Sequence, residues 1–556
     1  METDADVKPP CLFRQNDDGK AGKTTRDLTD LPSDVFLLII SHLSPQDSIL
    51  CRRVSRAWLA AFTSDQICRN FMRWHFPRCR EMRNLPDAPK QPQWAQIFPR
   101  VAQRYYYLRA AKPRLVEKID VVQETKQKGP HRGVEPWNRQ LRFDKHKAEF
   151  QYRDPTWCVD DGVLVYRENV SGRYVAYDLE TRYRFSIPFD GKDKTVRRLR
   201  LAYGVLIFEW CEREPYHQLN DRETVHRHFA TAFDVQRSSS RSSSPQASIV
   251  RSVSSPSSWS ITFRSEWKIH FLGLPLNHHD RFFSAHTATH YALYLWQPNR
   301  SPWGEEDPLE QLTVWDISFP SAYRPSLDPS GANRPDPDLA PVVVRRFTWR
   351  ELEFLGLRQR HTPSLREILL DERNVYVHDE DHRWLVGQHS SLSPPRHHHV
   401  RCTGVPFVGL GPRWLDECCA DGDVHMSFCP RAGSATARIG GARRPFGFDG
   451  TWPGWAPCWR HEEFPYLTVS DVVDPRAGIR VVARQCFMME ALSAFVLPKI
   501  SVESGEDEEG EEKEEPPEVR FPDEMWAELM GKGRICGDER WVVGEDREGK
   551  VTVVRF

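Results

Sequence analysis

The sequence predicts a small all-α module of three short helices, followed by a large mainly-β domain that is best interpreted as a β-propeller of open blade count. Three observations favour this fold class. Apolar residues have helical spacing over 28–76, short β-branched and aromatic runs separated by turn residues begin near 151, and a repeat of about 42 residues runs through them. A chain of 556 residues is also too long for one ordinary core.

Changes in composition divide the chain further. We expect a disordered leader over 1–27, the helical module over 28–76, a linker over 77–150 and the β-rich domain over 151–556. The linker carries one helical pattern, Trp94–Ala111, with an apolar face formed by Ile97, Val101, Tyr105 and Leu108. Runs of Ser, of Pro with Asp, and of Glu with Asp predict three disordered insertions in the β-rich domain, at 236–258, 320–341 and 503–517.

The repeat consists of two β-type elements. Gly162–Tyr166 recurs 42 residues later as Gly204–Phe208. A second element, in which Asp follows an aromatic residue, occurs at Ala176–Leu179, Ala232–Val235 and Val314–Ile317. This spacing is typical of a blade of four strands, and the Asp carboxylate suits a turn. The elements weakly resemble WD-type blades, and a β-sandwich stays open as the alternative.

The last residues of the chain predict how the ring closes. Lys550–Phe556 reads KVTVVRF, which alternates like a half-buried strand. We expect this strand to complete the ring against an early blade.

The helical module begins with Leu31-Pro32. Ser33 or Asp34 could cap the first helix, and Ser44 could cap the second with Pro45 at its first position. The apolar stripe of the first helix comprises Val35, Phe36, Ile39, Ile40 and Leu43, and that of the second Ile49, Leu50, Val54, Trp58 and Phe62. A short third helix is expected around Ile67–Phe71.

In order and without gaps, the module resembles the F-box family. The matching positions are Leu31-Pro32, Val35, Ile39, Leu43, Asp47, Cys51, Val54-Ser55, Trp58 and Asp65. The resemblance implies binding to the Skp-type adaptor of a cullin–RING ubiquitin ligase. It assigns adaptor contact to Leu31, Pro32, Val35, Ile39 and Val54, and a mixed core and contact role to Leu43 and Trp58. The alternative is that the stripe is plain core.

The resemblance therefore implies a substrate-recognition subunit of an SCF-type (Skp adaptor–cullin–F-box) E3 ubiquitin ligase, with an unknown protein substrate held by unidentified residues of the β-rich domain. The layout also resembles filamentous-fungal F-box proteins. A scaffold that uses the F-box outside ubiquitin transfer is the alternative function, and a propeller enzyme is a third.

Charge and composition exclude other classes. Lys and Arg total 77 against 78 Asp and Glu, which leaves no global field to attract nucleic acid or a membrane. No apolar run approaches the ~20 residues that a bilayer requires, and no signal peptide opens the chain. The 13 cysteines form no framework, so we expect reduced thiols in the cytoplasm, the nucleus or both.

Motifs for catalysis are missing from the sequence. It contains no Gly-x-Ser-x-Gly and no phosphate-binding Gly-x-x-x-x-Gly-Lys-Ser/Thr. His397–His399 and His278–Asp280 lack the spacing of a metal site, and we expect solvated loops there. We therefore predict a non-catalytic protein with no metal and no cofactor.

Overall fold

The computed structural model describes two compact units, which divide between Ala102 and Gln103. The predicted leader 1–27, the acidic insertion 503–517, His278–His279 and nearly all of 236–258 lie outside the described residues. Those described are 28–83, 93–122, 156–218, 224–237, 259–269, 276, 281–297, 307–334, 341–360, 364–384, 396–409, 413–420, 438–439, 442–443, 467–474, 476–485, 490–496, 518–530 and 534–556.

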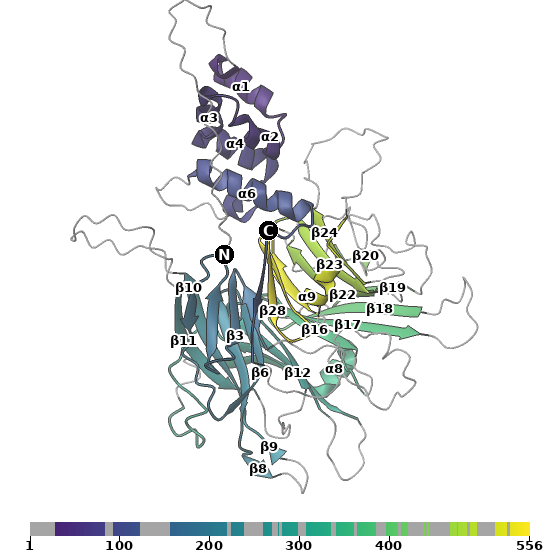
Figure 1. Cartoon of the computed structure of the whole chain (residues 1–556). Helices are drawn as coiled ribbons and strands as arrows, with labels where there is room; N and C mark the ends of the chain where they lie inside the picture. The colour runs from purple at the N-terminus through teal and green to yellow at the C-terminus, as the bar shows by residue number, and fades with distance from the viewer. Residues whose placement is uncertain are drawn as a thin grey trace, which may run out of the picture. The chain divides into compact units, whose positions relative to one another are not determined.

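The first unit is helical (Figure 1, purple). Its described elements are η1 (Leu28–Asp30), α1 (Ser33–Ile40), α2 (Pro45–Cys51), α3 (Arg56–Phe62), α4 (Asp65–His75), α5 (Arg80–Arg83) and the first half of α6 (Trp94–Arg109). The expected second helix is two helices, because the chain turns after Cys51 and Ser55 caps a new one. The predicted helix at Trp94–Ala111 is confirmed, two residues shorter than expected.

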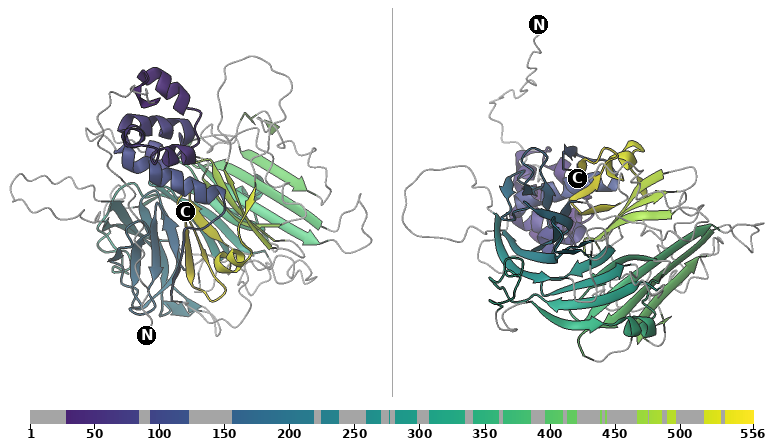
Figure 2. Two further views of the ribbon diagram at one scale, coloured as in Figure 1. Left: turned by 45° about the horizontal axis from the view of Figure 1, so that its top comes forward. Right: turned by 90° about the horizontal axis from the view of Figure 1, so that it is seen from below.

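The second unit is a six-bladed β-propeller. Each blade is a four-stranded antiparallel sheet, and the blades follow one another around the unit (Figure 2, right). From first strand to fourth, the first blade is β2 (Cys158–Asp160), β3 (Val163–Arg167), β4 (Tyr174–Asp178) and β5 (Arg184–Ser186), and the second blade is β6 (Lys194–Ala202), β7 (Val205–Glu212), β10 (His228–Arg237) and β11 (Trp259–Lys268). The third blade is β12 (Arg281–His286), β13 (His290–Gln297), β14 (Leu309–Asp316) and β15 (Val342–Phe347), and the fourth blade is β16 (Leu365–Leu370), β17 (Asn374–Trp384), β18 (Arg396–Pro406) and β19 (Trp414–Ala420). The fifth blade is β22 (Leu467–Asp474), β23 (Ile479–Gln485), β24 (Glu490–Val496) and β25 (Val519–Arg520), and the sixth blade is β26 (Ile535–Asp538), β27 (Trp541–Glu545), β28 (Val551–Arg555) and β1 (Leu115–Ile119).

First strands of successive blades contact each other around the ring. Strand β6 lies against β2 and β12, β12 lies against β16, and β26 lies against β22 and β2. The other described elements are the hairpins β8 (His217–Gln218)–β9 (Thr224–Val225) and β20 (Arg438–Ile439)–β21 (Ala442–Arg443), and the helices α8 (Trp349–Leu355) and α9 (Glu524–Leu529).

The ring is closed by strands from opposite ends of the unit. Strand β28 pairs antiparallel with β1, in a register that joins Leu115 to Arg555 and Ile119 to Val551. The C-terminal strand therefore completes the ring as expected. However, its partner was placed in the linker by sequence, and the structure corrects this. Five residues with a half-exposed, alternating pattern are too few to distinguish a strand from a connection.

The 42-residue repeat corresponds to the second and third strands of the first blades. Its glycines lie in two-residue hairpins, where Asp161-Gly162 and Tyr203-Gly204 both have positive φ. That geometry matches the twist of the flanking strands. The expected Asp turn is present at Asp178, which accepts a hydrogen bond from the Glu180 N–H at 2.9 Å, and at Asp316, which accepts one from the Ser318 N–H at 2.8 Å.

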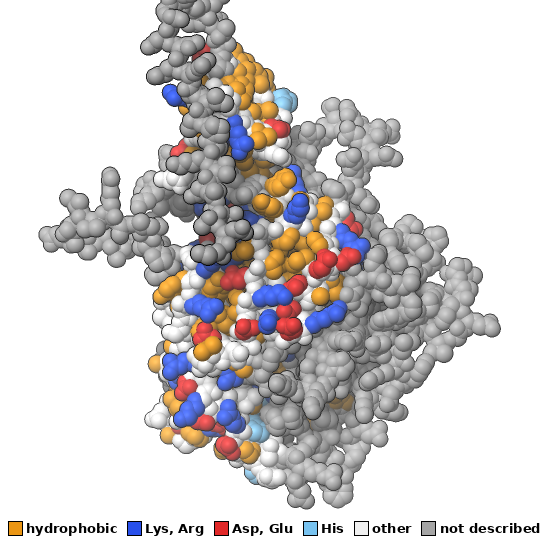
Figure 3. Space-filling model, in the orientation of Figure 1, with side chains coloured by type: hydrophobic (Ala, Val, Ile, Leu, Met, Phe, Trp, Pro, Cys, Tyr) orange, Lys and Arg blue, Asp and Glu red, His pale blue; other side chains and the backbone are white. Residues whose placement is uncertain are grey.

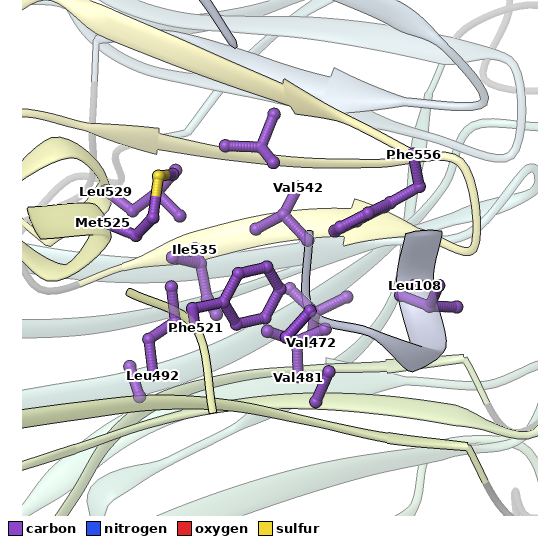
Figure 4. Close-up of a cluster of buried hydrophobic side chains, with 14 of the residues drawn as sticks. Leu108, Val472, Val481, Leu492, Phe521, Met525, Leu529, Ile535, Val542 and Phe556 are labelled. Atoms are coloured by element: carbon purple, nitrogen blue, oxygen red, sulfur yellow. The ribbon is translucent and has the colours of Figure 1, made fainter. Parts of the chain in front are cut away.

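A shared core joins the fifth and sixth blades (Figure 4). Phe521, Val542 and Phe556 meet there, and Leu108 from the second half of α6 packs into the same cluster. Next to Leu108, the Tyr105 hydroxyl donates to Glu539 at 2.6 Å and Arg104 forms an ion pair with the same buried carboxylate. The second half of α6 is thus part of the propeller unit.

Two sequence expectations about loops are wrong where the structure describes them. Residues 320–334, the first part of a segment expected to be disordered, form an ordered loop around Asp328. Its carboxylate accepts the backbone N–H groups of Ala332 and Asn333 and the hydroxyl of Tyr323. His397–His399 lie within strand β18 rather than in a loop, because that hairpin extends further than its apolar residues indicate.

Within the described residues, no helix is long and apolar enough to cross a membrane.

Gly162 provides a test of the closure between the first and sixth blades. A Cβ atom there would lie 2.6 Å from the Trp541 ring, and φ is +83°. Gly172 has a similar φ of +65° with nothing nearby, so Gly172→Ala incurs backbone strain alone. We expect Gly162→Ala to reduce the free energy of unfolding by at least about 1 kcal/mol more than Gly172→Ala, measured by chemical denaturation. Equal losses would show that Trp541 moves aside at no cost.

Candidate adaptor-binding site

An aromatic stack fixes the helices of the first unit. The Phe62 ring stacks on Trp58 and Phe71 with centroids 5.6 and 6.1 Å apart, and it meets Phe36 edge-on at 6.0 Å. Phe71 in turn stacks on Phe98 of α6 at 5.2 Å. Such contacts add about 0.5–1.5 kcal/mol per pair beyond the burial of apolar area. The stack therefore positions α1, α3 and α4 by one continuous contact.

Hydrogen bonds set where two of these helices begin. Ser44 caps α2 by accepting the Asp47 N–H at 3.1 Å, with Pro45 in the first turn, as the sequence predicts. Ser55 caps α3 by accepting the Trp58 N–H at 3.1 Å. The predicted caps Ser33 and Asp34 are wrong. Helix α1 begins at Ser33 after Pro32, whose side chain has no hydrogen-bonding group to cap it.

Asp65, one of the residues matching the F-box pattern, has a structural role in this unit. Its carboxylate accepts the Ala95 N–H at 2.7 Å, thirty residues along the chain. This bond satisfies an N–H in the first turn of α6. The Asp position therefore joins the start of α6 to the start of α4.

Apolar side chains gather on the outside of these helices (Figure 3, top of the view). Of the residues predicted to bind an adaptor, Pro32, Val35, Ile39 and Val54 are exposed, and Val54 leaves 62% of its surface in water. Leu31, Leu43 and Trp58 are half-buried. In contrast, Phe36, Ile40 and Phe62 from the same stripes are core residues. The stripe is therefore divided between a buried face and an exposed one.

The structure adds three residues to the exposed face. Leu38 is 67% exposed, and Leu50 and Leu59 are about half exposed. Leu50 belonged to the predicted apolar stripe, but the F-box pattern assigned it no contact role. Leu38 and Leu59 lie off that pattern, although their size and position on amphipathic helices were a usable signal. We call Leu38, Leu50, Leu59 and the exposed Pro32, Val35, Ile39 and Val54 the exposed F-box face.

First strands of the propeller carry several titratable side chains. Burial and the neighbouring Asp161 raise the pKa of Asp160 from 3.8 to about 6. Burial lowers the pKa of His286 to about 4. Burial also raises the pKa of Glu367, but the His378, Arg366, Arg534 and Arg200 charges outweigh it and hold the pKa below its usual range. Among the described residues, no group of three His, Cys, Asp or Glu side chains could hold a metal ion.

Comparisons with known proteins agree with the helical unit. A model of the F-box domain family matches residues 28–70. No curated protein matches the chain. Among solved structures, the chain is similar to the β-propeller domain of Cps50 (Swd1) from Myceliophteria thermophila, with 9% identity, a TM-score of 0.26, and coverage of 74% of this chain and 99% of that one. Because that score is low, the six blades rest on the strand pairing described above.

Capping provides a test of the helical unit with a built-in control. Ser55→Ala removes the hydrogen bond that begins α3 and should reduce the stability of that helix by about 1 kcal/mol. Ser64 precedes α4 without a side-chain capping bond, so Ser64→Ala should change stability by less than about 0.5 kcal/mol. Amide hydrogen exchange across 56–75 measures both, and similar losses would contradict the assignment.

Asp160 predicts a pH dependence of propeller stability. Its raised pKa means that the native state holds this proton more tightly than the unfolded chain. The free energy of unfolding should therefore contain a part that is present below about pH 4 and is lost as pH rises to about 6. Asp160→Asn should remove this pH-dependent part. The free energy of unfolding of the variant minus that of the unmodified protein should therefore be roughly 2 kcal/mol larger at pH 7.5 than at pH 4. Urea denaturation of both proteins between pH 4 and 7.5 tests this, and parallel curves would refute it.

Proposed function

Because this chain is an F-box protein, we propose that it acts as the substrate-recognition subunit of an SCF-type ubiquitin ligase. The F-box would bind the Skp-type adaptor and, through it, a cullin–RING ligase. The propeller would hold a protein substrate. We also propose that it works in the cytoplasm, the nucleus or both, without binding nucleic acid or membrane.

The exposed F-box face is the observation that carries this proposal. Seven apolar residues are exposed to water on the helical unit. Each buried Val, Leu or Ile side chain gains about 1.5–3 kcal/mol, so covering this face would be strongly favourable. The core residues of the same helices already pack in the aromatic stack, so they do not cover the exposed F-box face. A second protein that binds this face would bury it.

The propeller supports the substrate-binding half of the proposal. Six blades give a rigid scaffold whose connections can vary in length without disturbing the sheets. A substrate held there would be kept at high effective concentration near the ubiquitin carried by another subunit. The rate gain is then positional, and the chain itself catalyses no reaction.

Val54→Asp is the sharpest test of adaptor binding. Val54 is 62% exposed, so a charge there should leave the fold intact while it places an unpaired carboxylate in the interface. We expect the Kd for a purified Skp-type adaptor to rise at least tenfold, which corresponds to about 1.4 kcal/mol. Ile39→Asp should act in the same direction, as should Leu31→Ala and Pro32→Ala more weakly.

Gln66 is the matched control for that experiment. It is exposed on α4 of the same unit but does not belong to the exposed F-box face. Gln66→Asp should bind the adaptor like the unmodified protein. If Val54→Asp and Ile39→Asp also bind normally, the proposed interface is wrong.

Purification from the host separates a ligase subunit from a scaffold. Adaptor and cullin should both come with the full chain, and both should be lost from the Val54→Asp variant. Proteins that accumulate when this chain is removed, with proteasome activity controlled, are then substrate candidates. Adaptor that is recovered without cullin would favour the scaffold.

A further inference from the structure

We propose that Cys402 in the fourth blade is a reactive thiol, activated by His378, and a site of oxidation by small peroxides. Three neighbouring strands bring the residues together in register. Glu367 on β16 pairs with His378 on β17, and His378 pairs with Cys402 on β18. Side chains at paired positions of a sheet lie on the same face, so the carboxylate, the imidazole and the thiol form one row. On the other side of Cys402, the paired position on β19 is Asp416, an acidic residue whose charge would oppose a thiolate, so the His378 contact has to outweigh it.

The contact between sulfur and imidazole carries the proposal. Cys402 Sγ lies 3.2 Å from His378 Nε2, and Cys402 forms no disulfide. At this distance the imidazole can take the thiol proton, and the resulting thiolate is stabilised by the imidazolium beside it. A neighbouring histidine is among the environments that lower the pKa of a cysteine from about 8.5 into the range of about 3.5–7.5.

Glu367 completes the row from the first strand. Its carboxylate is ionised at neutral pH because the His378, Arg366, Arg534 and Arg200 charges outweigh the effect of burial. A carboxylate beside His378 favours the protonated ring.

Two other cysteines of the described residues, Cys158 and Cys68, provide the comparison. Burial raises the pKa of Cys158 and of Cys68. Cys68 lies against the Phe62 carbonyl oxygen, and its contact with Arg52 does not overcome burial. These thiols should stay protonated at neutral pH and serve as internal references.

The small exposed fraction of Cys402 limits the size of the oxidant that can reach it. Cys402 is 5% exposed, whereas His378 and Glu367 are half-buried. A small molecule that approaches past the His378 ring fits this arrangement better than another protein. Hydrogen peroxide is the simplest oxidant of that size.

The oxidation step balances with the groups present. The Cys402 thiolate attacks one peroxide oxygen, an S–O bond forms, and the O–O bond breaks. Sulfur loses two electrons to become sulfenic acid, and peroxide is reduced to hydroxide. The His378 imidazolium then protonates the hydroxide to water.

Alkylation of the full chain tests this directly. The reduced native protein is treated with iodoacetamide between pH 5.5 and 9, and labelling of each cysteine is followed by peptide mass spectrometry. At pH 6.5 Cys402 should react at least about tenfold faster than Cys158, with a midpoint below pH 7.5. His378→Asn should remove most of this advantage, and Glu367→Gln should remove part of it. Labelling in denaturant should equalise the cysteines.

Peroxide treatment followed by a sulfenic-acid trap supplies the second readout. Cys402 should be trapped in the native protein and in Ser variants of Cys158, and not after Cys402→Ser. The proposal is overturned if native Cys402 reacts no faster than Cys158, because the thiol would then simply donate to a neutral imidazole. It is also overturned if a folded His378→Asn variant reacts unchanged. If that variant fails to fold, the pH midpoint of the native protein and the Glu367→Gln rate decide.

Discussion

The pairing of β1 with β28 is the contact on which the second unit depends. A propeller blade buries both faces against its neighbours, so an open ring would expose the apolar faces of two blades at once. Here the last strand of the chain takes as its partner a strand from before the first blade, with a continuous register from Leu115 to Ile119. The closing blade thus contains both ends of the propeller sequence. Neither end can leave without opening the ring.

Hydrogen bonds to carboxylates reinforce the same junction. Trp157, just before the first blade, donates to Glu545 of the sixth blade at 3.0 Å. Tyr177 of the first blade donates to Glu117 of the sixth blade at 2.7 Å. Between the second and third blades, the Tyr291 hydroxyl donates to the buried Glu209 at 2.9 Å. Glu545 and Glu209 are buried, and a buried carboxylate is costly without a donor. These two pairs therefore favour the observed alignment of the neighbouring blades. These pairs recur with different residues and therefore leave no fixed motif in the sequence.

The two units use apolar surface in opposite ways. In the propeller, the large side chains of the repeat are buried between blades, as Val165 and Phe208 show. In the helical unit, the aromatic stack takes the inner residues and leaves leucine, isoleucine and valine side chains in water. The first arrangement is typical of a self-sufficient domain. The second is typical of one that completes its core with a partner, and this contrast underlies the proposed division of labour.

Local chemistry in the sequence determined a large part of this protein. Apolar spacing with Ser44-Pro45 specified the first helices, and the glycine hairpins with their Asp turns specified the second and third strands of the early blades, because each depends on neighbours in the chain. Only the tertiary structure decided which stripe residues face water, since Ile39 and Ile40 are adjacent and identical in type but differ in burial. It also decided that Leu115–Ile119 belongs to the last blade and that His378 meets Cys402. Both contacts depend on strands that pair across long stretches of chain, a property that no local pattern contains.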